Sequence, residues 1–117
     1  MTPPARDVRV RALWRDDPTE APLTVDLRIE EEDGRIVSTW DVFGAFDLVG
    51  ASRRPFILRR DGALDLGVAA PGLAWRTDLR DKAIKVGARF LVRWNETDVG
   101  EYEIVKIAEL GTKDARS

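Results

Sequence analysis

The alternation of apolar and polar side chains is strictest in Leu23-Thr24-Val25-Asp26-Leu27-Arg28-Ile29-Glu30. Successive side chains of a β-strand point to opposite faces of the sheet. The apolar residues of this stretch therefore share one face and the polar residues share the other. This pattern predicts an amphipathic strand with one buried face and one solvated face.

Two other segments, residues 7–14 and residues 88–94, follow the same two-residue period, and each predicts a strand. The apolar residues that share a face are Val8, Val10, Ala12 and Trp14 in the first segment, and Phe90, Val92 and Trp94 in the second. Residues 73–76 predict a further short strand.

Residues 101–110 predict the last strand, but its apolar residues change face part-way along. Tyr102 and Ile104 share one face, whereas Val105 and Ile107 occupy the other. This change predicts either a β-bulge or a strand covered on both sides.

Turn signals join these strands into hairpins. The polar run at residues 31–34 ends in a glycine and predicts a reversal, so that residues 23–40 form one hairpin. Asp61-Gly62 lies between two apolar runs and predicts a second hairpin with a type I′ turn, whose two central residues need positive φ.

One segment, residues 41–50, does not fit the strand pattern. Val42, Phe46 and Val49 recur at helical spacing and Gly50 can end a helix, so we expect a short helix here. Gly44 weakens that helix by about 1 kcal/mol relative to alanine. The alternative is an irregular apolar loop.

Together these signals predict an all-β fold, a small antiparallel barrel or sandwich of about seven strands with one short helix near residues 41–50. The chain has 117 residues, of which 44% are hydrophobic. That length suffices for one core without disulfides, so we expect a single β domain over residues 1–117 with polar termini.

The absence of two residue types reduces the number of functions that this chain could have. The chain has no cysteine and no histidine, which excludes Cys/His zinc sites and the usual His-dependent nucleophile systems. The glycines are single, so no phosphate-binding loop is present. The acid pairs Asp61/Asp65 and Glu101/Glu103 are best interpreted as strand-face charges, and residues 95–100 lack calcium-loop ligands. We expect a protein that is not an enzyme, with no catalytic residue, metal or cofactor.

No stretch predicts a signal peptide or a membrane span, so we expect no membrane partner. Charge is unequally distributed, because residues 51–94 carry a net charge of +6 while residues 1–50 carry −5 and residues 95–117 carry −3. The basic segment could form a one-sided positive surface for an acidic partner. Alternatively, strands from the three segments could lie side by side and pair their charges.

Four arginines surround an aromatic residue in the basic segment: Arg53, Arg54, Arg59 and Arg60 flank Phe56. Such an arrangement suits a groove for single-stranded nucleic acid or a contact with an acidic protein. The sequence pI of about 5.2 argues against nucleic acid.

The chain has four tryptophans, and each is in phase with apolar neighbours. Such residues usually lie in the core with the indole N–H hydrogen-bonded, so we favour core packing over carbohydrate binding. One or two of them could be partly exposed at an oligomer interface. The tryptophans are Trp14, Trp40, Trp75 and Trp94.

The C-terminal third resembles the end of the small β-barrel proteins that join head to tail in long-tailed bacteriophages. The similarity covers residues 73–110, with Leu73-Ala74-Trp75-Arg76-Thr77-Asp78, Val86-Gly87-Ala88-Arg89-Phe90 and Tyr102-Glu103-Ile104-Val105-Lys106-Ile107. Residues 13–18 are also similar to an early strand and turn of the lambda-like joining proteins. Residues 35–70 follow no pattern of that family.

The resemblance implies a structural virion protein, assembled in the host cytoplasm, whose copies form a ring at the head-tail connection. Its partners would be other copies of itself, the neighbouring portal, adaptor or tail proteins, and packaged DNA. Two alternatives are a barrel that binds single-stranded nucleic acid through Arg53, Arg54, Arg59 and Arg60, and a capsid-decorating interaction module.

Overall fold

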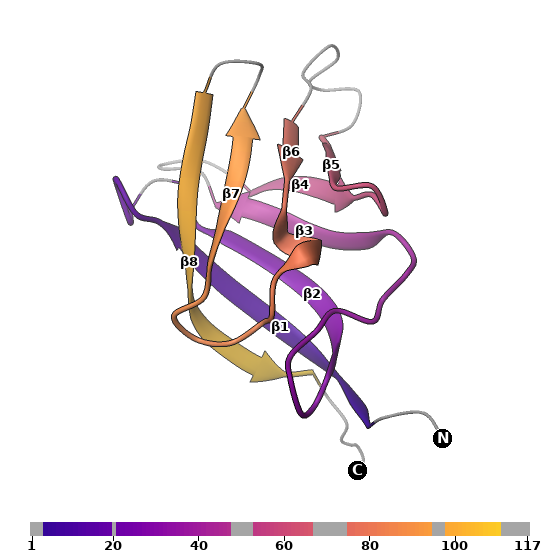
Figure 1. Ribbon diagram of the computed structural model, residues 1–117. Helices are drawn as coiled ribbons and strands as arrows, with labels where there is room; N and C mark the ends of the chain where they lie inside the picture. Colours follow the sequence, from indigo (N-terminus) through magenta and orange to yellow (C-terminus); the bar gives the residue numbers. More distant parts are fainter. Residues whose placement is uncertain (1–3, 20, 48–52, 67–74, 95–97, 111–117) are drawn as a thin grey trace.

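A computed structural model describes residues 4–19, 21–47, 53–66, 75–94 and 98–110, which form a closed antiparallel β-barrel (Figure 1). Eight strands follow one another around the barrel in chain order, and β8 closes it by pairing with β1. The strands are β1 (Ala5–Trp14), β2 (Leu23–Glu30), β3 (Val42–Asp47), β4 (Arg53–Leu58), β5 (Ala63–Asp65), β6 (Trp75–Thr77), β7 (Arg89–Trp94) and β8 (Asp98–Glu109).

The all-β prediction is therefore confirmed, with eight strands where the sequence indicated about seven. The one helical element described is a single 3₁₀ turn, η1 (Leu79–Asp81), between β6 and β7. The predicted inward face of the strand at residues 23–30 is also confirmed. The apolar residues of β2 are all buried, namely Leu23, Val25, Leu27 and Ile29.

The predicted irregularity in the last strand is a β-bulge. Arg11 of β1 pairs with Lys106 and the next residue, Ala12, pairs with Ile104, which leaves Val105 without an opposite residue. The extra residue returns the following apolar side chain, Ile107, to the core side, where it packs against buried residues. The bulge therefore explains why apolar residues occupy both alternation phases of β8.

The helix predicted over residues 41–50 is wrong, because residues 42–47 form β3 and pair with both β2 and β4. Val42 and Phe46 lie four residues apart, a spacing that places them on one side of a helix and also on one face of a strand. Backbone pairing with β2 on one side and with β4 on the other makes this segment a strand. Residues 48–50 lie outside the described part of the chain.

Gly44 has a packing role in this strand. A Cβ at this position would lie 2.5 Å from the Phe56 ring and 2.5 Å from the backbone oxygen of Thr24. The glycine that weakens a helix is therefore what allows β3 to approach both neighbours.

The hairpin predicted over residues 23–40 is found only close to its turn. Ile36 bridges Ile29, the Glu30 N–H donates to the Arg35 oxygen at 2.8 Å and the Val37 N–H donates to the Arg28 oxygen at 2.9 Å. The strand that pairs with the start of β2 is β3, and residues 31–41 form the connection between them. Gly34 adopts a φ of 74° in this connection. Its backbone oxygen accepts a hydrogen bond of 2.7 Å from the Ile84 N–H, which ties the connection to the segment before β7.

The Asp61-Gly62 hairpin is confirmed as the connection between β4 and β5, but its turn is shifted by one residue. The Gly62 N–H donates to the Arg59 oxygen at 3.1 Å, so Arg60 and Asp61 are the central residues. Gly62 has a φ of 93°, whereas Asp61 has no positive φ. This is the geometry of a type I turn followed by a left-handed glycine, not of a type I′ turn.

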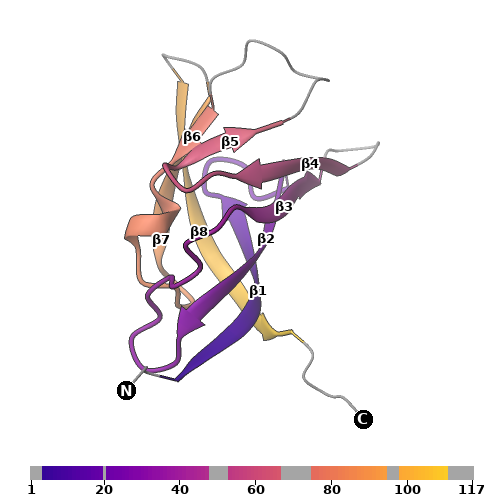
Figure 2. The same cartoon turned by 90° about the vertical axis from the view of Figure 1, so that its right-hand side faces the viewer.

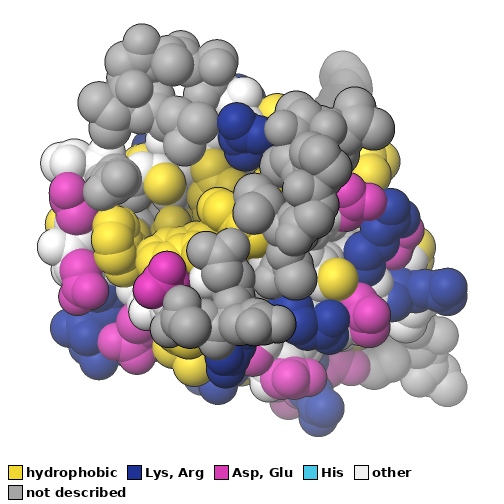
Figure 3. Space-filling model, turned by 90° about the horizontal axis from the view of Figure 1, so that it is seen from above, with side chains coloured by type: hydrophobic (Ala, Val, Ile, Leu, Met, Phe, Trp, Pro, Cys, Tyr) yellow, Lys and Arg dark blue, Asp and Glu magenta, His cyan; other side chains and the backbone are white. Residues whose placement is uncertain are grey.

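Aromatic rings fill the barrel toward the ends of β1 and β7. Seven of the nine aromatic residues form a continuous chain of ring contacts with centroid distances between 5.1 and 6.4 Å. Three of the tryptophans are thus partly buried and pack against the core, as expected, but the buried indole N–H groups of Trp14 and Trp75 have no hydrogen-bond partner among the described residues. Figure 3 shows hydrophobic side chains gathered at this end of the molecule. The seven residues are Trp14, Phe46, Phe56, Trp75, Phe90, Trp94 and Tyr102.

β1 begins and β8 ends at the end of the barrel opposite the aromatic rings. Val8 pairs with Glu109, and the Leu110 N–H donates to the Asp7 oxygen at 2.9 Å. The start of β1 and the end of β8 therefore lie side by side, opposite the aromatic end (Figure 1).

The close packing of Gly44 can be tested with Gly44→Ala. We expect this variant to lower the free energy of unfolding by about 1–3 kcal/mol, because the added methyl group must displace a core ring and a strand backbone. Urea unfolding followed by circular dichroism measures the change. Ala45→Ser, on the opposite face of the same strand, is the control and should stay within about 0.5 kcal/mol. An unchanged unfolding midpoint for Gly44→Ala would contradict the packing.

Candidate interaction surfaces

The outer face of the barrel pairs its charges across neighbouring strands. Arginines of the basic middle segment bind acids from both acidic segments: Arg53 binds Asp47 at 3.1 Å, Arg59 binds Asp41 at 2.8 Å and Arg89 binds Glu103 at 3.5 Å. The charge segments are therefore self-complementary in space, the second of the two arrangements considered from the sequence.

The four arginines named from the sequence lie in different environments. Arg53 and Arg59 are held by aspartates. Arg54 points to the opposite face from Arg53 at the start of β4, where it pairs with Phe46 and is half-buried. Arg60 is exposed in the β4–β5 turn.

These positions do not make one continuous groove. Six residues of extended chain separate Arg53 from Arg59, which is roughly 20 Å. Two of the four guanidinium groups are already bound to carboxylates on the barrel. The arrangement therefore gives little support to the nucleic-acid interpretation.

The paired carboxylates are also engaged in strand-face ion pairs. Glu101 accepts a hydrogen bond of 2.8 Å from Arg15, and Glu103 lies 3.6 Å from the same guanidinium. Asp65 binds Arg59. Within the described ranges, no three His, Cys, Asp or Glu side chains gather in a way that could hold a metal ion. No helix in the same ranges has the length and hydrophobicity of a membrane span.

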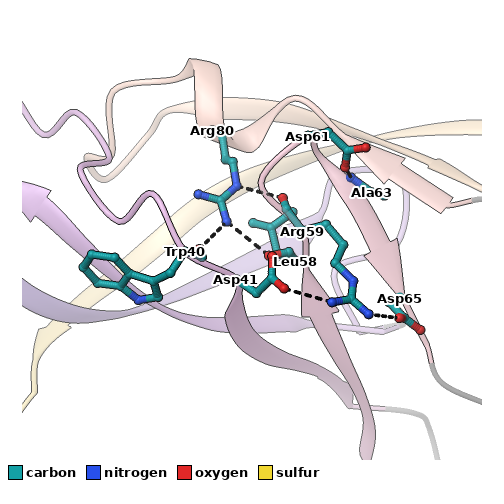
Figure 4. Close-up of polar contacts among 8 residues, drawn as sticks. All are labelled: Trp40, Asp41, Leu58, Arg59, Asp61, Ala63, Asp65 and Arg80. Carbon is teal, nitrogen blue, oxygen red and sulfur yellow. Dashed lines mark hydrogen bonds and ion pairs between the residues drawn. The ribbon is translucent and has the colours of Figure 1, made fainter.

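Arg80 is the centre of a hydrogen-bond network that joins η1, the 31–41 connection and the β4–β5 hairpin (Figure 4). Its guanidinium donates to four backbone oxygens. These belong to Arg59 at 2.9 Å, Ser38 at 2.6 Å, Trp40 at 2.9 Å and Leu58 at 3.1 Å. Desolvation by burial lowers the pKa of Arg80 from its ordinary value. A planar guanidinium with five N–H donors is suited to such a role, and an ammonium is not.

Arg59 completes the support of this connection from the outer face. It donates to Asp41 at 2.8 Å and also to Asp65, so it links the residue that precedes β3 to β5. These hydrogen bonds raise the pKa of the Arg59 guanidinium. Arg80 and Arg59 together fix the backbone of residues 38–41, and the indole of Trp40 points away from them (Figure 4).

The Trp40 indole and the Phe43 ring form an exposed aromatic surface, here called the Trp40–Phe43 face. They are the two aromatic side chains outside the core chain, and they are 50% and 68% exposed. Both line a shallow hollow of about 380 Å³ on the outer face of β1, β2 and β3. The Arg28 guanidinium lies 5.6 Å from the Trp40 ring centroid, a cation–π distance. Trp40 is therefore the exception to the expected core packing.

A second apolar surface, here called the Leu91–Val99 face, consists of Leu91 on β7 and Val99 on β8. Each side chain is 44% exposed, and both line a hollow of about 290 Å³ together with polar residues of the β6 region. Leu91 and Val99 point outward because Phe90, Val92 and Gly100 occupy the inward positions.

The two faces lie on opposite sides of the barrel. Three strands separate β3 from β7 in either direction around the closed sheet. Figure 2 shows β7 on the left of the barrel and β3 on the right. All six of the exposed large apolar side chains among the described residues belong to these two sides. Trp40 and Phe43 are on the first side, and Val86, Leu91, Val99 and Val105 are on the second.

No protein-family model, curated protein or solved structure gives a significant match to the chain. The resemblance of residues 73–110 to phage head-tail joining proteins therefore stays a prediction. The fold and the two faces are the observations from which function must be argued.

Reasoning from the sequence missed the residues that shape these surfaces. Phe43 lies in the segment predicted to be a helix, Leu91 lies between the inward residues of the strand predicted over residues 88–94, and Arg80 lies outside every predicted strand. One signal was present for Leu91, which is apolar at an outward position of a predicted strand, whereas Val99 precedes the strand predicted over residues 101–110, although β8 begins at Asp98. Nothing in the local sequence indicates that Arg80 binds Ser38, which is 42 residues away in the chain.

The Arg80 network is tested by Arg80→Lys. We expect a loss of about 1–3 kcal/mol in the free energy of unfolding, because one ammonium cannot satisfy four carbonyl oxygens in fixed positions. Amide hydrogen exchange should also become faster in residues 35–41. The control is Arg60→Lys, because Arg60 is exposed and makes no ion pair within the described part of the chain. Equal stability of Arg80→Lys and wild type would refute the network's role.

The outer-face carboxylates predict a loss of stability in acid. Hydrogen bonds from Arg28 lower the pKa of Asp7, and the backbone N–H of Ala63 lowers the pKa of Asp61. The unfolded chain therefore binds more protons than the folded chain in acid, so stability is present above pH 4 and is lost from about pH 4 downward.

Thermal unfolding of Asp7→Asn at two pH values checks this sign. The variant should melt below wild type at about pH 7 and approach wild type at about pH 2, where the Asp7 carboxyl is protonated in both states. Asp16→Asn is the matched control, because Asp16 is exposed and makes no hydrogen bond or ion pair with the rest of the described residues. A gap between Asp7→Asn and wild type that does not narrow in acid would contradict the assignment.

Proposed function

We propose that this protein is a structural assembly subunit, not an enzyme, and that its copies join head to tail into a closed ring. One observation supports this proposal: the exposed large apolar side chains of the described residues fall into two groups, one on β3 and the connection before it, and the other on β7, β8 and the connection before β7. Two unlike faces on one subunit generate a heterologous interface, which gives a ring when the rotation between copies closes.

The closed sheet favours association through side chains. Every described strand has a hydrogen-bonded neighbour on both sides, so the barrel has no whole strand at an open edge within the described residues. This arrangement favours contact between copies through the outer faces of the strands. Most charges on those faces are already paired within one copy, which leaves the apolar groups as the main source of binding free energy.

We further propose that the ring belongs to the head-tail connection of a tailed bacteriophage virion. This step depends on the resemblance over residues 73–110, a segment that contains β6, β7 and β8 and carries the Leu91–Val99 face. The neighbours of the ring would then be portal, adaptor or tail proteins, with packaged DNA passing through its centre.

Mass photometry and negative-stain electron microscopy of the purified protein test the ring. We expect closed oligomers of one size, whose population grows with protein concentration and persists in high salt, because apolar contacts are screened little by ions. A fluorescence assay with short single-stranded oligonucleotides runs in parallel. A strict monomer at every concentration that binds oligonucleotides at low salt would overturn the proposal in favour of the nucleic-acid alternative.

A further inference from the structure

We propose that the Trp40–Phe43 face of one copy binds the Leu91–Val99 face of the next copy, with the Trp40 indole as the anchor. The inference rests on the proposed head-to-tail assembly and names the two surfaces that meet in it. Its occupant is a second copy of this chain.

Trp40 has the properties of an interface anchor. Its backbone oxygen is held by Arg80 at 2.9 Å, and Arg80 also fixes Ser38 and the end of β4. The exposed indole rests against Arg28, whose guanidinium is itself held by two hydrogen bonds to Asp7. A large aromatic side chain fixed before binding loses little conformational entropy in the complex.

The opposite hollow offers the chemistry that an indole and a phenyl ring require. Leu91 and Val99 supply apolar contact, and the guanidinium of Arg76 can lie against an aromatic face. Asp81 borders the same hollow, and its exposed carboxylate makes no hydrogen bond or ion pair within the described ranges. The indole N–H of Trp40 is a donor, so this carboxylate is a suitable acceptor.

Electrostatics also permit two identical copies to meet in this way. The three carboxylates that line the Trp40–Phe43 hollow are each paired with an arginine of their own copy: Asp7 with Arg28, Asp26 with Arg9 and Asp41 with Arg59. The Leu91–Val99 hollow has carboxylates interspersed with arginines. The charges of the Trp40–Phe43 rim are therefore compensated within its own copy, and the unpaired Asp81 carboxylate of the other rim would meet no uncompensated carboxylate there, so like-charge repulsion does not oppose the contact.

The surface chemistry favours this pairing over a two-fold contact of the Trp40–Phe43 face with itself. Self-contact would bring two copies of Arg28 and its partner Asp7 together around the indoles and would leave the Leu91–Val99 face exposed to water. Pairing the two different faces covers both apolar groups in one interface.

Two complementary variants test the inference. The donor-face variant is Trp40→Ala with Phe43→Ala, and the acceptor-face variant is Leu91→Glu with Val99→Glu. Each should keep the wild-type circular dichroism spectrum and should raise the protein concentration of half-assembly by at least about tenfold. Val86→Ser is the matched control, because Val86 is 64% exposed on the same side but does not line the hollow.

The decisive measurement mixes the two variants. Each lacks one face and keeps the other, so a head-to-tail contact predicts a 1:1 heterodimer that cannot grow, seen by mass photometry or sedimentation. A wild-type ring with no heterodimer in the mixture would overturn the inference and leave the proposed ring intact. Continued assembly of either variant at wild-type concentrations would do the same. A monomeric wild type would instead refute the proposed function itself.

Discussion

Closure of the sheet by β1 and β8 is the constraint on which the other features of this protein depend. β8 pairs with β7 on one side and with β1 on the other, and the bulge at Val105 returns Ile107 to the core side that Tyr102 and Ile104 also face. Because the sheet closes, its inward side chains fill a single interior, and seven aromatic rings meet there. The same closure gives every described strand a neighbour on both sides, which favours association through side chains on the outside.

The outer surface follows from a second feature, the charged residues that occupy many of the outward strand positions. Cross-strand pairs such as Arg9 with Asp26 and Arg15 with Glu101 neutralise these positions within one molecule. Exposed pairs of this kind contribute little stability individually. Their larger effect is to leave a surface on which two apolar groups stand out, and these lie on opposite sides because β3 and β7 are opposite in the closed sheet.

The predictive power of the sequence differed from one element to another for physical reasons. β2 and β7 could be predicted because one face of each is buried, which imposes a two-residue period on Leu23, Val25, Phe90 and Val92. The segment containing Val42 and Phe46 could not, because a four-residue spacing suits a helix and a strand equally, and pairing with distant strands decided between them. The exposure of Trp40 was equally hidden, since it depends on a connection held by Arg80 from another part of the chain.

The side-by-side exit of β1 and β8 gives the barrel a direction. One rim carries residues 4 and 110, and the opposite rim carries the aromatic residues at the ends of β1 and β7. In a ring of copies related only by rotation about its axis, every subunit faces the same way, so the whole assembly has one surface of each kind. A ring with two dissimilar surfaces can bind a different structure on each side. A ring with dihedral symmetry has two identical sides and cannot do this.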